Sequence, residues 1–182
     1  MAIHWQHIDK VALRGAMTGS NPTDRSKQGT KRHILTDKEG IPLSVVISSA
    51  NTHDIKLVTN VIDKTVVKRP SPKSHGKKRN KHYHLCLDKA YISKSVKQEI
   101  IKRGYMPHIV CKRKMGEKAK TETDDIYHRK RYPARRWVVE RTNSWHNRFR
   151  KLFTRYEKKA ENYLGLVQMS CSIIIYRKII LG

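Results

Sequence analysis

Acidic residues are scarce in this chain. Its 182 residues include 15 Asp and Glu against 40 Lys and Arg, which gives a formal net charge of +25 at pH 7. This imbalance argues against an enzyme of small neutral metabolites and favours a polyanionic partner, of which nucleic acid is the obvious one. A ribosomal or other RNA-binding protein would carry the same charge. The charge therefore predicts binding to a nucleic acid. It does not explain the role of the few Asp and Glu residues.

Cysteine and long apolar runs are scarce as well. Cys86, Cys111 and Cys171 are scattered without any C-x-x-C pair, each in an apolar context. We interpret them as buried free thiols, a pattern that suits a reducing cytosol and argues against a disulfide framework or a structural zinc. Neither end of the chain carries an apolar signal core or a stretch long enough to span a membrane. We therefore expect a cytoplasmic protein.

Apolar segments between the charges predict a globular fold. Such segments lie at residues 43–47, 85–87 and 173–176, so a disordered basic tail is disfavoured. The length suits one domain with a core, which we expect to cover residues 1–182. Two stretches lack apolar periodicity, and we expect basic loops at 69–81 and 112–131.

Hydrophobic spacing predicts an α/β fold. Alternation and β-rich composition predict strands at 3–9, 33–36, 41–48, 83–87 and 106–111, the second and third joined as a hairpin. Helical spacing predicts helices at 53–67, from Ser93 to Gly104, at 135–156 and at 161–179. Asn51 or Thr52 is expected to cap the first helix, and Trp137, Trp145 and Phe149 are expected on the inner face of the third. This order indicates a mixed central sheet flanked by helices.

Three acids stand at places where chemistry could occur. Asp88 follows a buried strand, where open α/β sheets place their ligands, although an Asp there can simply cap a turn. Glu140 lies among apolar and aromatic neighbours in a helix, although a lone helical Glu is more often a surface partner of Lys or Arg. Asp9 ends the first predicted strand. If the three converge, they form a set of hard oxygen ligands that suits Mg²⁺ or Mn²⁺ rather than zinc.

Several motifs together resemble one family. They are NPTDRSKQGTKRH at 21–33, GIPL at 40–43, NTHD at 51–54, DKAY at 88–91, RWVVERTNSW at 136–145, NRFR at 147–150 and YEKKAENY at 156–163. With these motifs the chain resembles bacterial insertion-sequence transposases of the DDE type. The likeness runs from Trp5 to Lys178, nearly the whole chain.

The resemblance implies a fold, a site and a reaction. Family members have a ribonuclease-H-like fold, and the match makes Asp9 (in WQHID at 5–9), Asp88 and Glu140 the three catalytic, metal-binding acids. Two Mg²⁺ or Mn²⁺ ions held by such acids would assist phosphoryl transfer, so that one site cleaves DNA and also joins strands. The expected partners are the terminal repeats of an insertion element, the target DNA and a second copy of the chain in a homodimer or larger synaptic assembly. The expected location is the bacterial nucleoid.

The chain departs from the family in two places. The segment from Asp9 to Asn21 is a few residues shorter than the family pattern, and the helical region that precedes the first motif is missing. We therefore expect an amino-terminally truncated transposase, completed by a separately encoded segment. The alternative is a catalytically inactive remnant that only binds DNA. A strand that carries Asp9 beside Asp88 would favour activity, and a displaced strand would favour the remnant.

Basic residues near these motifs are candidates for phosphate contacts. A solvated surface cation is the other interpretation for each of them. His53 and Asp54 are interpreted as a helix cap or a structural hydrogen bond rather than as catalytic residues. The predicted DNA-binding residues are Arg25, Lys31, Arg32, Lys89, Arg136, Arg141, Arg148 and Arg150.

Overall fold

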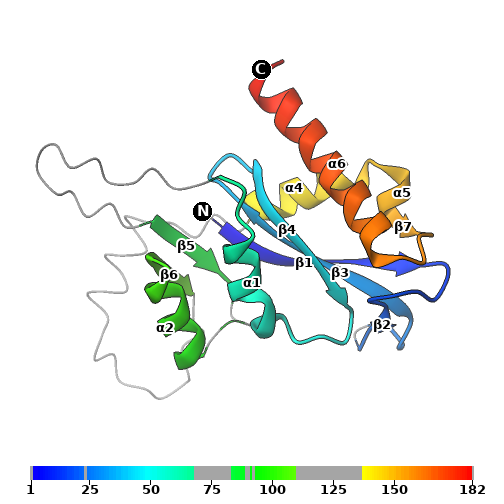
Figure 1. The fold of residues 1–182 in the computed structure, drawn as a ribbon, viewed down its shortest axis with the longest axis horizontal. Helices are drawn as coiled ribbons and strands as arrows, with labels where there is room; N and C mark the ends of the chain where they lie inside the picture. The colour runs from blue at the N-terminus through cyan, green and yellow to red at the C-terminus, as the bar shows by residue number, and fades with distance from the viewer. Residues whose placement is uncertain are drawn as a thin grey trace, which may run out of the picture.

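The computed structural model describes residues 2–22, 24–67, 83–88, 91, 93–109 and 137–181, with side chains from residue 8 onward. Figure 1 labels the elements along the chain. The strands are β1 (Ala2–Val11), β2 (Gly19–Ser20), β3 (Gln28–Thr36), β4 (Pro42–Ser49), β5 (Tyr83–Leu87), β6 (Tyr105–Ile109) and β7 (Thr154–Arg155). The helices are η1 (Asp54–Leu57), α1 (Val58–Asp63), α2 (Lys94–Lys102), α4 (Trp137–Asn147), α5 (Arg150–Phe153) and α6 (Ala160–Ile179).

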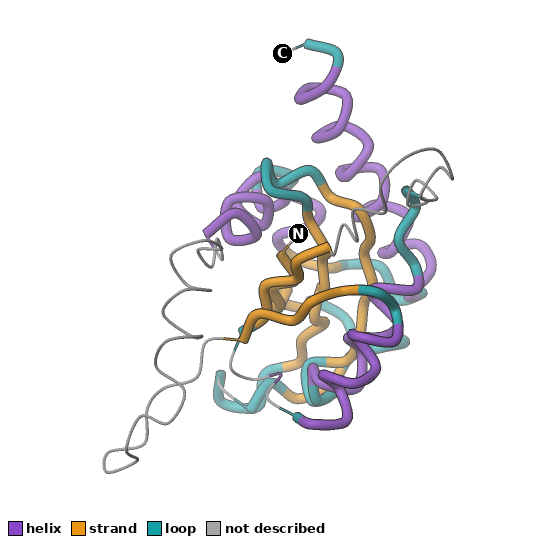
Figure 2. The backbone as a smooth tube through the Cα atoms, turned by 90° about the vertical axis from the view of Figure 1, so that its left-hand side faces the viewer, coloured by secondary structure: helices purple, strands orange, loops and turns teal. Residues whose placement is uncertain are grey.

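The strands form one mixed sheet with β1 at its centre. Its order is β2-β3-β1-β5-β6, with β4 paired to β3 and β7 paired to β1. The β1–β3, β2–β3 and β3–β4 pairs are antiparallel, whereas β1–β5, β1–β7 and β5–β6 are parallel. Figure 2 shows the strands between helices on either side. The predicted α/β fold, a ribonuclease-H-like mixed sheet flanked by helices, is confirmed.

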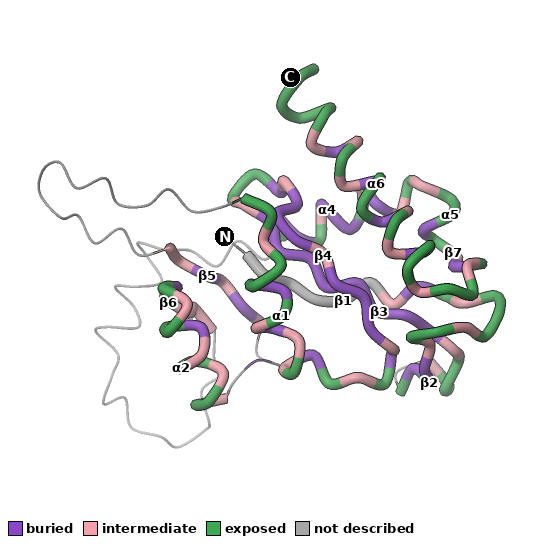
Figure 3. Tube along the Cα trace, in the orientation of Figure 1, coloured by how far each residue is buried: buried purple, intermediate pink, exposed green. Residues whose placement is uncertain are grey.

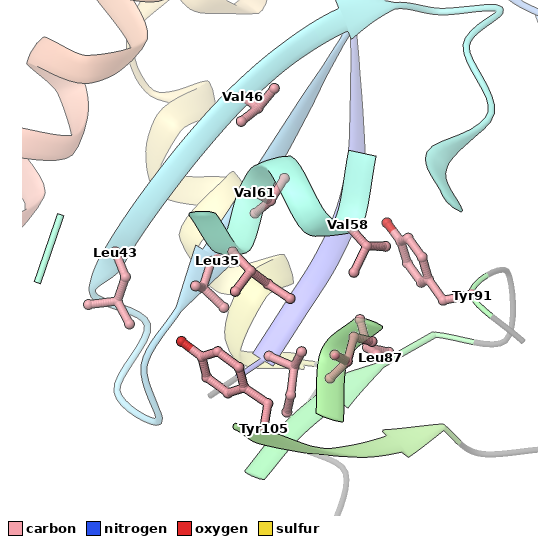
Figure 4. Packing of buried hydrophobic residues seen from close by; sticks show 11 residues of the cluster. Leu35, Leu43, Val46, Val58, Val61, Leu87, Tyr91 and Tyr105 are labelled. Atoms are coloured by element: carbon pink, nitrogen blue, oxygen red, sulfur yellow. The ribbon is translucent and has the colours of Figure 1, made fainter. Parts of the chain in front are cut away.

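Two apolar clusters hold the helices to the two faces of the sheet. The first joins β3, β4, β5 and β6 to α1 and α2, and Figure 4 shows Leu35, Val58, Leu87 and Tyr105 packed within it. The second joins Ile47 of β4 to α5 and α6 on the opposite face. Figure 3 shows the buried sheet and the exposed far end of α6. In the described part of the chain, no helix is both long enough and apolar enough to cross a membrane.

The predicted strands are confirmed, with shifted ends, but two predicted helices differ. The helix expected at 53–67 is a short 3-10 turn followed by α1, and its cap is His53, whose ring accepts a hydrogen bond from the Ile55 amide. The prediction of Asn51 or Thr52 as the cap is therefore wrong. The helix expected at 135–156 stops at Asn147, and the chain then forms α5 and β7. A pairing with the distant β1 overrides the helical spacing there.

The orientation of α4 also corrects a prediction. Its buried face consists of Val138, Val139, Thr142, Asn143 and His146. Trp137 is 54% exposed and is therefore not on the inner face, while Trp145 and Phe149 are half-buried. The free thiols of Cys86 and Cys171 are half-buried rather than buried. Cys111 and the predicted loops at 69–81 and 112–131 lie outside the described residues.

Candidate active site

Asp9 lies near the end of β1, opposite Thr30 of β3, and has no exposed surface. Its Oδ1 forms an ion pair with Nη2 of Arg32 at 2.8 Å. Its Oδ2 accepts a hydrogen bond from the Tyr163 hydroxyl at 2.5 Å. The same Arg32 nitrogen donates to Oδ1 of Asn147 at 2.8 Å. Both carboxylate oxygens of Asp9 are therefore engaged by side chains from β3 and α6.

The pKa of Asp9 reflects this burial. Desolvation raises it from 3.8 to about 7, against the opposing effects of the Arg32 charge and of the hydrogen bonds from Tyr163 and Arg32. Burial thus shifts the pKa of Asp9 more than the ion pair with Arg32 does, as is common for charges removed from water. The folded protein holds a proton on Asp9 more tightly than the unfolded chain does.

This raised pKa predicts a pH-dependent stability. Because the folded pKa lies above the unfolded value, the stabilisation from protonated Asp9 is complete below about pH 4 and is lost as the pH rises through about 7. We therefore compare the unfolding free energies of the wild type and of Asp9→Asn. The wild type should lose a few kcal/mol relative to the variant between pH 5 and 8, on the order of 1.4 kcal/mol for each unit by which the pKa is raised. Urea unfolding of both proteins across this range measures the difference. A difference that does not change with pH would contradict the burial of an ionisable group at this position.

Asp88 lies at the other end of β1. The parallel pairing sets Ala2 opposite Cys86, so Asp88 is level with His4, five positions before Asp9. Because β1 has a bulge between Trp5 and His7, these five positions span only four residues of β3, so Asp9 is offset by about 13 Å along the sheet at roughly 3.3 Å per residue. Figure 1 shows the same arrangement: β5 ends beside the start of β1, whereas the far end of β1 lies beside β7.

The surroundings of Asp88 include a buried phenol. Its carbonyl accepts a hydrogen bond from the Tyr91 amide at 3.1 Å, which closes a turn after β5. The pKa of the Tyr91 hydroxyl is raised well above 10, first by burial and then by the negative charges of Asp54 and Asp88. Asp54 and Asp88 thus both lie close enough to act on the Tyr91 hydroxyl.

Glu140 shares the end of the sheet that holds Asp88. It is exposed in the first turn of α4, and the next two residues fasten this turn to the β3–β4 connection. The Arg141 guanidinium donates to the carbonyl of Glu39, and the Thr142 hydroxyl donates to that of Gly40 at 2.7 Å. Gly40 has a φ of 85°, and a Cβ there would lie 2.9 Å from Oγ1 of Thr142, so only glycine fits this contact. The connection follows Thr36, which pairs with Ala2 at the start of β1.

The three predicted metal ligands do not meet in this arrangement. Asp88 and Glu140 lie toward one end of β1 and Asp9 toward the other. Among the described residues, no group of three His, Cys, Asp or Glu side chains is placed to hold a metal ion. On this placement the described residues do not form a donor set for two shared divalent cations, and the Asp9 carboxylate is already engaged by Arg32. The assignment of Asp9, Asp88 and Glu140 as catalytic acids stays a prediction.

Two of the predicted DNA contacts are corrected by their burial. Nζ of Lys31 is 3.0 Å from Oδ1 of Asp54 and donates to the Thr52 carbonyl at 2.9 Å. Lys31 is 6% exposed and Arg32 is not exposed at all. Both cations serve as partners of buried acids, on opposite faces of β3, and neither can reach a phosphate.

The remaining candidates differ in their exposure. Arg25, Arg148 and Arg150 are exposed. The Arg141 guanidinium is half-buried and lies 4.8 Å from the Trp137 ring centroid and 5.0 Å from that of Trp145. Lys89 and Arg136 lie outside the described residues. The exposed arginines are thus the described candidates with charge available to DNA.

The structural roles of two residues were not predicted from the sequence, which had suggested a DNA-backbone contact for one of them, Arg155. Tyr163 is the hydrogen-bond donor to Asp9, and Arg155 is a buried cation that donates to the Thr30 hydroxyl at 2.7 Å and to the Ala16 carbonyl at 2.7 Å. Together with the β1–β7 pairing, these contacts fix the far end of β1. The only sequence signal was their position within or beside the YEKKAENY motif.

Comparison with known proteins identifies the class to which this basic, helix-flanked sheet belongs. Residues 6–175 match the family model described as "Transposase DDE domain". The chain therefore belongs to the DDE-domain transposase family. It is 32% identical over 169 residues to a Burkholderia cepacia protein, the "Putative transposase for insertion sequence element IS402". The match covers 93% of this chain and 73% of that relative. Transposases act on DNA, which accounts for the basic composition.

Proposed function

We propose that this chain binds DNA as a transposase-family protein and does not cut DNA while β1 keeps the register described above. The position of Asp9 is the observation that carries this proposal. Its carboxylate is fully buried between Arg32 and Tyr163, about 13 Å along the sheet from the level of Asp88. Removing any one acid from a three-acid metal site removes a ligand that the reaction needs.

The binding half of the proposal is supported by charge. A net charge of +25 attracts DNA through its phosphates, and Arg25, Arg148 and Arg150 present exposed guanidinium groups. We extend the proposal to the terminal repeats of an insertion element and to target DNA as ligands. We also propose that residues 1–182 act as one domain, and that two copies pair to hold two element ends.

A second candidate function is metal-dependent strand cleavage and strand transfer. The placement of Asp88 and Glu140 at the same end of the sheet favours it. In this candidate, Asp9, Asp88 and Glu140 would hold Mg²⁺ or Mn²⁺, hard cations that prefer carboxylate oxygens. It requires Asp9 to leave Arg32 and to reach the level of Asp88.

A cleavage assay distinguishes the two candidates. The purified chain is incubated with labelled linear DNA carrying the terminal repeats of the element, with Mg²⁺ or Mn²⁺. We expect salt-sensitive binding, and nicking no higher than that of Asp88→Ala or Glu140→Ala, because the described register keeps Asp9 away from the level of Asp88. The matched binding control is Arg148→Ala, which should reduce the slope of log affinity against log salt by about 1.

Two results would overturn the proposal in different ways. Metal-dependent nicking by the wild type that both acid variants lose would establish the second candidate. Preferential binding of structured RNA over DNA would refute the DNA-binding half.

A further inference from the structure

We propose that His84 and His108 form a binding site for a transition-metal ion of the Zn²⁺, Ni²⁺ or Cu²⁺ class at the edge of the sheet. Nδ1 of His84 and Nε2 of His108 are 2.7 Å apart. The ring centroids are 4.9 Å apart, with an interplanar angle of 33°. This site does not depend on the proposed DNA function.

The strand register brings the two imidazoles together. In the parallel β5–β6 pair, Met106 lies opposite His84, and His108 lies opposite Cys86. His84 and His108 are thus diagonal neighbours on one face of the pair, because alternate residues share a face. Leu85 and Leu87 point to the other face, into the apolar core. Among the described strands β6 is the last in the sheet order, and both histidines are half-buried, so the pair lies at the edge of the described sheet.

The nitrogen geometry is close to that of a chelate. In the neutral pair one ring donates its proton to the other, because each neutral imidazole has one N–H and one lone pair. A tautomer change that moves this proton to the outer nitrogen turns both lone pairs inward without net proton loss. Bonds of about 2.0–2.1 Å to an ion then require the two nitrogens to be roughly 2.9–3.4 Å apart. The two nitrogens need to move apart by a few tenths of an ångström, and each ring has to turn so that its lone pair points at the ion instead of at the other ring.

The chemistry of the donors selects the ion. Imidazole nitrogen suits Zn²⁺, Ni²⁺ and Cu²⁺, whereas Mg²⁺ and Mn²⁺ prefer oxygen. No third His, Cys, Asp or Glu completes the set within the described parts of the chain, so we assign two protein ligands from these parts. An ion held in this way joins β6 to β5 and stabilises the edge of the sheet.

Thermal unfolding of the full chain with and without Ni²⁺ or Zn²⁺ tests the site. At about a hundredfold excess over the dissociation constant we expect the melting temperature to rise by about 5–10 °C. His84→Ala, His108→Ala and the double variant should lose this rise, and Mg²⁺ should not produce it. The matched control is His53→Asn, which removes an exposed histidine but keeps a residue able to cap η1; its metal response should match that of the wild type. Cys86→Ser should also keep the response.

Two further variants keep the proposal falsifiable if an Ala variant folds poorly. His84→Asn and His108→Asn preserve a polar side chain of similar shape, and calorimetric titration with Zn²⁺ should find one ion fewer per chain in each than in the wild type. A metal response that persists in the double variant, or that falls equally in His53→Asn, would overturn the site. So would a response that Cys86→Ser abolishes, since it would move the ligand set to the thiol.

Discussion

Replacing Arg32 with Ala is expected to remove about 3–5 kcal/mol of unfolding free energy, a large part of the roughly 5–15 kcal/mol that stabilises a typical domain. Arg32 has no exposed surface, and its guanidinium pairs with Asp9 and donates to Asn147. Its removal leaves a buried carboxyl group without its cation and leaves a void between β3 and α4. Urea unfolding followed by circular dichroism measures the loss.

Two variants separate the ion pair from a general effect of losing arginine. Arg148→Ala removes an exposed guanidinium and should change stability by less than about 0.5 kcal/mol. The double variant Asp9→Asn and Arg32→Met buries no unpaired charge, and should recover most of the loss. If Arg32→Ala were as stable as Arg148→Ala, the pair could not be what holds β1 in its register.

The local parts of the fold were predictable because the sequence patterns that encode them repeat every few residues. Alternation along β4 and β5, and helical spacing along α6, are properties of neighbouring residues, and their boundaries agree within a few positions. β7 has two residues, too few for any period. It exists because Thr154 and Arg155 pair with Lys10 and Val11, a long-range contact that no local pattern encodes.

The sequence predicted which acids belong to the candidate site, but not which side chains bind them. Basic residues near the motifs were interpreted as DNA contacts because Lys and Arg bind phosphates, although such an interpretation requires an exposed side chain. Arg32 is an exception because it meets Asp9 across the β1–β3 pair, and Tyr163 reaches Asp9 from 154 residues away. The register of β1 against β5 could not be predicted from the sequence for the same reason. A sequence shows that Asp9 and Asp88 each follow or end a strand, but not that their levels differ by five residues.

Lengthening the connection after β1 is expected to have the largest effect on chemistry. Sliding β1 by about four residues along β3, in the direction of its own first residue and with its bulge moving along, keeps its side chains on their faces, because strand residues alternate with a period of two. Asp9 would then leave Arg32 and lie next to the level of Asp88. An insertion of four small polar residues between Leu13 and Arg14, which are both exposed, supplies the chain needed for that slide. It also avoids Gly15, whose added Cβ would lie 2.3 Å from the Lys158 carbonyl oxygen.

With Mg²⁺ or Mn²⁺, the lengthened chain should nick labelled element-end DNA on the order of 10²-fold faster than the wild type, because three carboxylates would then surround the cations. Asp9→Asn or Asp88→Ala in the lengthened chain should abolish the gain, which excludes a contaminating nuclease. A two-residue insertion is the matched control, since it leaves Asp9 about 7 Å short and should gain little. A lengthened chain that folds and binds DNA but still does not nick would mean that the register of β1 is not what separates binding from cleavage. The Arg32 and Tyr163 contacts to Asp9 would then be the cause, and Arg32→Met in the lengthened chain would be the variant in which nicking should first appear.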